Sequence, residues 1–287
     1  MRPLLLLMAM LLAACHSTPG VLPPPVAGAP GNIIDLRSGE VLSPAELVER
    51  LARAPRVIVG EQHDNADHHA LQLWLLRSMA LDRPQGSLLL EMLNPDQQPR
   101  VDALKGSLGG RRLPDGLPGL LAWQSGWDWS LYGLLVSYAL VQPYPLLAAN
   151  LDRQEVRGIY AQAPRLPGGR ANASAVTEAL STQIRESHCG LLPESQVPAM
   201  LAVQQQRDRR MAERLLAAPI PALLFAGTFH GRKDLGVPLH VADLDQTQSV
   251  AVLLLAEQGS QVFASAADFV WYTPPQPDKD YCAQLRP

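Results

Sequence analysis

The sequence has little net charge, few aromatic residues, only three cysteines and no apolar run long enough to span a bilayer. A spanning helix needs about 20 consecutive apolar residues, so none is expected. The net charge is −3 and the arginines are scattered without a basic stripe, so nucleic acid is not expected as a partner. No internal repeat suggests a solenoid or a propeller.

The first residues, MRPLLLLMAMLLAAC, combine one positive charge, a short apolar run and small residues before Cys15. This pattern is typical of a cleaved export signal and resembles a bacterial lipoprotein signal. We therefore predict a signal peptide at 1–14 and acylation of Cys15, including palmitate. The alternative is an ordinary signal peptide with an unmodified cysteine. Each methylene of an acyl chain buried in the bilayer contributes roughly 0.8 kcal/mol to membrane binding, so the acyl chains on Cys15 would anchor the protein without a spanning helix.

The residues after Cys15 bear on where the anchor lies. His16 stands where an aspartate would indicate retention in the inner membrane, so we predict the outer membrane. Residues 15–30 are rich in proline, glycine and alanine and predict a lipidated tether.

Two cysteines remain beyond Cys15. Cys189 and Cys282 are far apart in the sequence, and an even pair in an oxidising envelope predicts a disulfide that ties the tail to the body. Metal ligation by Cys189 and the neighbouring His188 is the alternative. No second Cys/His pair flanks these residues, which favours the disulfide.

Short, continuously apolar runs predict buried strands at Val57–Val59, Leu88–Leu90, Leu146–Ala149, Leu223–Ala226 and Val250–Leu255. Helical patterns separate the runs, and one helix is expected to begin after an N-cap at Asp64 or Asn65. The sequence thus predicts an α/β fold with a mostly parallel central sheet flanked by helices. Residues 31–287 are expected to form one domain, with helical cap insertions at about 94–135 and 171–216.

Polar side chains follow four of these runs, namely Glu61 and His63, then Glu91, then Asn150 and Asp152, then His230. Open parallel sheets bind ligands outside the carboxyl ends of their strands, so we expect these groups to converge. Burying several polar groups without a partner is costly. We therefore predict a ligand site built by Glu61, His63, Glu91 and His230, with Arg207 approaching the two carboxylates.

Several motifs carry a family resemblance: VGEQHDNADHH, LLLEM, GWDWSLY, AAN, SHCG, QQQRDRRMAE, AGTFHGRKDLGVP and WYTP. In this order they closely resemble the ChaN-like haem-binding lipoproteins. Those belong to a wider group with erythromycin esterases and TIKI-type metal-dependent proteases, which share Glu-x-His and Gly-x-x-His elements. The resemblance implies an iron-regulated outer-membrane lipoprotein of a haem and iron uptake system, and we predict that it faces the periplasm. It also implies an α/β core with a helical cap and a homodimer that encloses haem.

The resemblance further implies a tyrosine on the haem iron, and ferric haem suits a phenolate or imidazole ligand. We predict Tyr132 for this role, with Tyr138 and Tyr160 as alternatives. Other haem contacts are expected from His63, His69, Arg207 and His230, with Arg210 an alternative to Arg207 for the propionates. Trp123, Trp127 and Trp129 either wall the macrocycle or pack inside the cap.

A second function belongs to a different class. Glu61, His63, Glu91 and His230 could hold a divalent metal such as zinc or manganese and activate a water for hydrolysis. Alternatively, a histidine beside Glu61 could act as a general base without metal. The sequence lacks a His-Glu-x-x-His helix, and the resemblance is strongest to binders. A purely structural lipoprotein would leave the converging charges unexplained. We therefore predict a non-catalytic haem carrier.

Overall fold

The computed structural model describes residues 23–25, 32–109 and 112–283. The predicted signal peptide, Cys15 and all of the tether except 23–25 lie outside the described residues. Within the described part of the chain, no helix combines the length and the apolar character that a membrane crossing requires.

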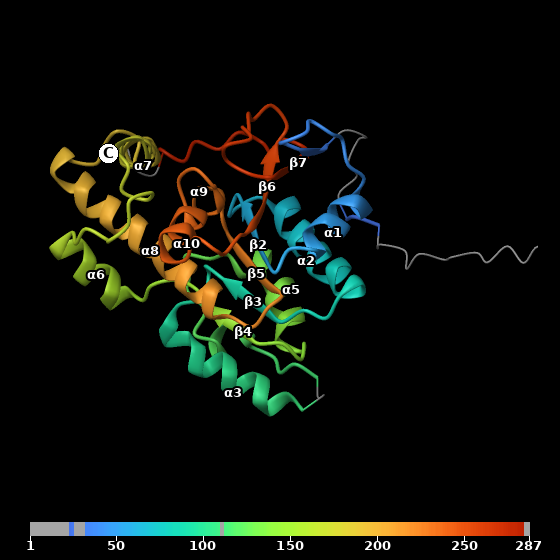
Figure 1. The fold of residues 1–287 in the computed structure, drawn as a ribbon. Helices are drawn as coiled ribbons and strands as arrows, with labels where there is room; N and C mark the ends of the chain where they lie inside the picture. Colours follow the sequence, from blue (N-terminus) through green and yellow to red (C-terminus); the bar gives the residue numbers. More distant parts are fainter. Residues whose placement is uncertain (1–22, 26–31, 110–111, 284–287) are drawn as a thin grey trace, which may run out of the picture.

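A seven-stranded sheet forms the centre of the molecule (Figure 1). Its strands are β1 (Ile33–Asp35), β2 (Arg56–Glu61), β3 (Ser87–Leu90), β4 (Leu146–Ala148), β5 (Ala222–Gly227), β6 (Ala251–Glu257) and β7 (Phe269–Thr273). The spatial order is β1-β7-β6-β2-β5-β3-β4. All neighbouring pairs are parallel except β1 with β7. The carboxyl ends of six strands therefore lie along the same edge of the sheet.

Helices lie between successive strands from β1 to β6, whereas β6 and β7 are joined without a helix. The helices are α1 (Pro44–Ala52), α2 (Ala66–Asp82), α3 (Gln98–Leu108), α4 (Leu117–Leu120), α5 (Trp129–Leu140), α6 (Arg153–Gln162), α7 (Ser174–Ser187), α8 (Val197–Ala217), α9 (Thr228–Gly231) and α10 (Val237–Leu244). Two 3-10 turns, η1 (Pro95–Gln97) and η2 (Glu194–Gln196), precede α3 and α8.

Both faces of the sheet are covered, because alternate residues of each strand point to opposite sides. In β2, Val57 and Val59 face a core that contains α1, α2, α3 and α5. Ile58, between them, faces a second core with the C-terminal half of α8 and with α10. This two-sided burial explains why the strands are continuously apolar.

The α/β fold with a mostly parallel sheet is confirmed, and all five predicted strands are present within one or two residues of their expected bounds. Strands β1 and β7 were not predicted. Of the two expected cap segments, the first forms α3, α4 and part of α5, and the second forms α7 and most of α8. In Figure 1, α6, α7 and the start of α8 lie beside the sheet on one flank. The single-domain boundary and the extent of the cap stay predictions.

The helix expected after the first strand is α2, and its N-cap is Asn65. The Asn65 side chain accepts from the backbone N–H groups of Asp67 and His68 at 3.0 and 3.3 Å. It also donates to Glu257 at 2.8 Å, which ties the start of α2 to β6. Asp64 lies before the cap and contacts the C-terminal tail instead.

Replacing the two candidate caps separately tests this assignment. Asn65→Ala is expected to lower the free energy of unfolding by about 1–2 kcal/mol, because it removes the cap and the Glu257 contact. Asp64→Ala is the matched control and should cost less than about 0.5 kcal/mol, since its partners are exposed. Urea denaturation of both variants measures the difference. Equal losses would show that Asn65 is not the cap.

Candidate functional site

The four residues of the predicted polar site come together. Glu61 ends β2, Glu91 directly follows β3, and His230 lies on α9 immediately after β5. Because β5 lies between β2 and β3, the three segments open at adjacent points of one edge. His63 completes the group from the turn that follows β2.

Glu61 organises one half of this cluster. Its carboxylate is 1% exposed. Oε1 accepts from His63 Nδ1 at 2.8 Å and from the Tyr132 hydroxyl at 3.0 Å. Oε2 lies 3.3 Å from His69 Nε2 without a hydrogen bond of good geometry. Burial lowers the pKa of His63, but the Glu91 and Glu61 carboxylates outweigh it, so that the pKa is raised.

Glu91 and Asp208 enclose His230 in the other half. His230 Nε2 lies 3.4 Å from Glu91 Oε1, and Nδ1 lies 2.6 Å from Asp208 Oδ1. The other Glu91 oxygen accepts the Gly227 N–H at 2.8 Å. Burial by itself would raise the pKa of Glu91, yet His230 and His63 hold it well below its usual range. The two halves of the site are thus joined through Glu91.

Close packing around Gly227 sets the position of His63. A side chain at Gly227 would begin 2.6 Å from His63 Nε2, closer than real Cβ contacts occur. A glycine is therefore required at the end of β5 for His63 to reach this position. Nε2 lies 3.8 Å from Glu91 Oε2, and the imidazole is 37% exposed.

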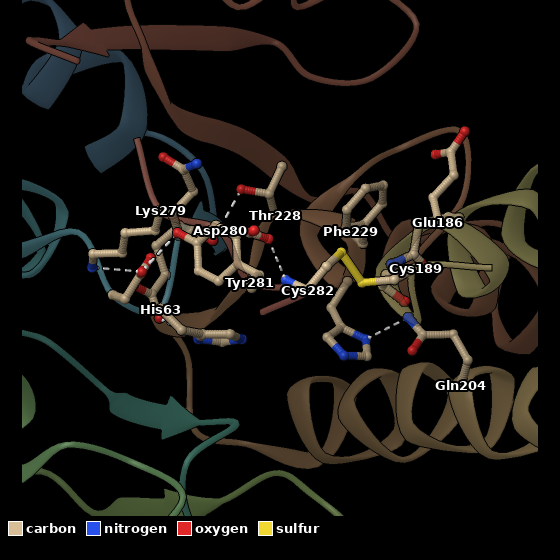
Figure 2. A pocket seen from close by; sticks show the side chains of 17 residues that line it. His63, Glu186, Cys189, Gln204, Thr228, Phe229, Lys279, Asp280, Tyr281 and Cys282 are labelled. Carbon is tan, nitrogen blue, oxygen red and sulfur yellow. Dashed lines mark hydrogen bonds and ion pairs between the residues drawn. A yellow bond between two sulfur atoms is a disulfide. The ribbon is translucent and has the colours of Figure 1, made fainter. Parts of the chain in front are cut away.

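A cavity of about 790 Å³ opens above this cluster (Figure 2). Its floor includes Glu61, His63 and His230, and its walls include Phe229 of α9 and Tyr281 of the C-terminal tail. Cys189 and Cys282, joined by a disulfide, complete one side. In Figure 2 the disulfide joins the tail to Cys189 after α7, and the labelled Thr228 and Phe229 of α9 lie next to this connection.

Other predicted residues lie outside the cavity wall. Tyr132 is 1% exposed, its hydroxyl is bonded to Glu61, and burial together with Glu61 raises the pKa of this phenol. Trp123, Trp127 and Trp129 pack against the core that contains α2 and α5, and Trp127 is in edge contact with His63. Tyr138 packs on Arg77, and Tyr160 lies on the exposed side of α6.

Among the described residues, all of the remaining candidates except Arg207 have structural partners. Arg207 neither lines the cavity nor contacts the cluster, and Arg210 pairs with Glu155. His69 contacts the His63 carbonyl oxygen at 3.0 Å beneath the site. Asn150 donates to the Glu91 carbonyl oxygen, and Asp152 caps α6. His188 contacts the Ile184 carbonyl oxygen at the end of α7.

Two site residues were missed by the sequence reasoning. Asp208 is fully buried on α8 and adjoins the predicted Arg207. Because successive helical residues point about 100° apart, only one of the two can face His230. The sequence feature that could have identified Asp208 is a carboxylate among the apolar positions of α8. Tyr281 was missed because no sequence pattern shows that the tail returns to the site.

Metal binding has no ready geometry here. Throughout the described ranges, no group of three or more His, Cys, Asp or Glu side chains is arranged to hold a metal ion. Glu61, His63, Glu91 and His230 instead pair among themselves as acid–base partners.

Comparison with known proteins places these features in context. The family model described as haem-binding uptake, Tiki superfamily, ChaN matches residues 47–241. The match ends before β6, β7 and the tail. A solved structure described as cofacial heme binding to ChaN of Campylobacter jejuni has a TM-score of 0.76 and 27% identity, covering 83% of this chain and 94% of that one.

A second solved structure, an erythromycin esterase mutant in its open conformation, has a TM-score of 0.44 and 15% identity, covering 80% of this chain and 78% of that one. That likeness is too weak to bear on function. No curated protein matches the chain.

The charge state of His230 is testable by NMR titration. Burial lowers its pKa, but Glu91 and Asp208 raise it to about 10. Its protonation therefore stabilises the fold below the unfolded value of 6.5, and this contribution is lost as pH rises through about 10. Asp208→Asn should lower the pKa by roughly one unit or more.

His240 serves as the internal control for that titration, because burial lowers its pKa and its ring should stay neutral at pH 7. A His230 signal that titrates near 6.5 in the unaltered protein would contradict the enclosed ion-pair geometry.

Proposed function

This chain belongs to the family described as haem-binding uptake, Tiki superfamily, ChaN, and from that membership we propose that it is a non-catalytic haem carrier. Haem is its ligand, held at the carboxyl ends of β2, β3 and β5. The observation that carries the proposal is the cavity of about 790 Å³ at this edge of the sheet. Its size falls within the range of roughly 300–1,000 Å³ that is usual for small-molecule sites.

The cavity wall fits a flat, largely apolar macrocycle. Phe229 and Tyr281 are large side chains that remain 40% and 66% exposed at the cavity. Exposed aromatic surface of this kind is stabilised when a ligand covers it. Lys279, also in the wall, offers a positive charge for a haem propionate.

The iron ligand we propose is Tyr281 rather than Tyr132. The Tyr132 hydroxyl is committed to Glu61 inside the core, so iron could reach it only after that buried hydrogen bond breaks. The Tyr281 hydroxyl lies at the cavity and donates to Asp64 at 2.7 Å. This bond raises the pKa of Tyr281 to about 12, so coordination must displace the phenolic proton. Asp64 is placed to accept that proton.

We propose that two subunits bind haem together. The Campylobacter jejuni relative is described as binding heme cofacially, and a cavity with exposed aromatic walls suits a haem shared across a dimer. A single protein ligand on each iron leaves the cargo releasable. Assembly is expected to depend on haem and on protein concentration.

The cellular role follows from the amino terminus, as a proposal of its own. Acylation of Cys15 would attach the carrier to the outer membrane, facing the periplasm, where it would pass haem to other components of an uptake system. Mass spectrometry of the native amino terminus should find a lipidated Cys15. A chain that keeps an unmodified cysteine in the soluble fraction would overturn this part.

A hemin titration tests the proposal directly. Purified protein should give a saturable Soret band and the charge-transfer band of a ferric phenolate. Tyr281→Phe should abolish the charge-transfer band and weaken binding at least tenfold. Tyr160→Phe is the matched control, because Tyr160 is also exposed but lies on α6 outside the cavity.

The same titration separates the candidate ligands. Tyr132→Phe should leave the charge-transfer band in place. Loss of the band in that variant alone would return the ligand role to Tyr132. Absence of hemin binding, with a stoichiometric zinc or manganese retained instead, would replace the carrier by the metal-dependent hydrolase.

A further inference from the structure

The C-terminal tail crosses the mouth of the cavity. Residues 274–283, here called the strap, leave β7 and run across the carboxyl edge of the sheet toward α7, as the red trace in Figure 1 shows. The strap contributes Lys279, Asp280, Tyr281 and Cys282 to the cavity wall. It ends at the disulfide between Cys282 and Cys189, which lies just after α7.

Noncovalent contacts hold the strap weakly. It forms neither helix nor strand, and most of its residues are exposed. Lys279 and Tyr281 both bond to Asp64, and Gln276 reaches Asp67 at 3.4 Å. The Lys279–Asp64 pair lies at the surface, where such pairs contribute about 0–1 kcal/mol. A segment with these properties opens locally at little cost unless a covalent bond retains it.

The composition of the strap determines how it would move. Pro274, Pro275 and Pro277 favour an extended, semi-rigid backbone after β7. A strap released at its far end would therefore swing away from the cavity. Tyr281 is the residue next to Cys282, so the disulfide fixes the position of the proposed iron ligand directly.

We propose that the Cys189–Cys282 disulfide is a redox-controlled lock, which keeps the strap over bound haem when oxidised and opens the cavity when reduced. This inference rests on the proposed haem-binding function. Both cysteines are half-buried and line the cavity, so a small dithiol or the thiol site of a reducing protein has a route to the sulfur atoms.

The chemistry is thiol–disulfide exchange with an external dithiol. One thiolate of the reductant attacks a sulfur of the Cys189–Cys282 bond and releases the other cysteine as a thiolate. The second thiolate of the reductant then attacks the mixed disulfide and frees the first cysteine. The protein gains two electrons and two protons as two thiols, and the dithiol becomes its own disulfide.

The first test does not involve haem. Backbone order parameters from ¹⁵N relaxation should be near 0.85 for strap residues of the oxidised protein and fall below about 0.6 after treatment with dithiothreitol. The double variant Cys189→Ser/Cys282→Ser should show the low values without reductant. Residues of β7 serve as the internal reference and should not change. A strap that stays ordered in the reduced protein and in the double variant overturns the proposal.

The second test follows transfer of hemin from the loaded protein to apomyoglobin. Reduction should accelerate release at least tenfold, and the double variant should release at the faster rate with or without dithiothreitol. Dithiothreitol can also act on the iron itself. The double variant measures that effect alone, because it has no disulfide to reduce. Equal release rates for oxidised, reduced and variant proteins overturn the lock while leaving haem binding intact. Failure of both the oxidised and the reduced protein to bind hemin removes the proposed function, and the lock with it.

Discussion

Two carboxylates buried at the end of a sheet must each find positive charge, and this requirement organises the site. Glu61 and Glu91 are almost wholly buried. Leaving either unpaired would cost several kcal/mol. His63 and His230 supply the compensation, with Tyr132, Asp208 and the Gly227 N–H completing the network. Because the two carboxylates follow or end β2 and β3, and their partners come from the turn after β2 and from β5, α5, α8 and α9, the cluster fixes the relative positions of the elements that surround the cavity.

This network also determines which polar side chains are available to bind a ligand. Groups that neutralise one another inside the fold are poor candidates for binding cargo, since release costs the buried contact. Tyr132 and Asp208 therefore support the floor, whereas the exposed wall formed by Phe229 and Tyr281 is available to a ligand. This division suits the proposed carrier. The floor of the cavity is held by buried contacts, whereas the wall, contributed in part by the strap, can change its position.

The central strands could be predicted from the sequence because each is a continuous apolar run bounded by turns. Glu61, Glu91 and His230 could be predicted as site residues because each follows such a run. The sequence did not reveal β1, which has only three residues, or β7, whose aromatic run gave no clear pattern. It could not show that Asp208 rather than Arg207 faces His230, since that depends on the rotation of α8. The course of the strap depends on long-range contacts with Asp64 and Cys189, which leave no local signal.

Haem is proposed to occupy the cavity above the paired carboxylates. The position of the iron can be measured in an anomalous difference map from crystals of the hemin-bound protein. We expect one iron peak per subunit inside the cavity, within bonding distance of the Tyr281 hydroxyl oxygen and beside Phe229. An iron peak in the open groove beside Trp129 and Leu134, or coordinated by Glu61 and His63 beneath the cavity, would contradict it.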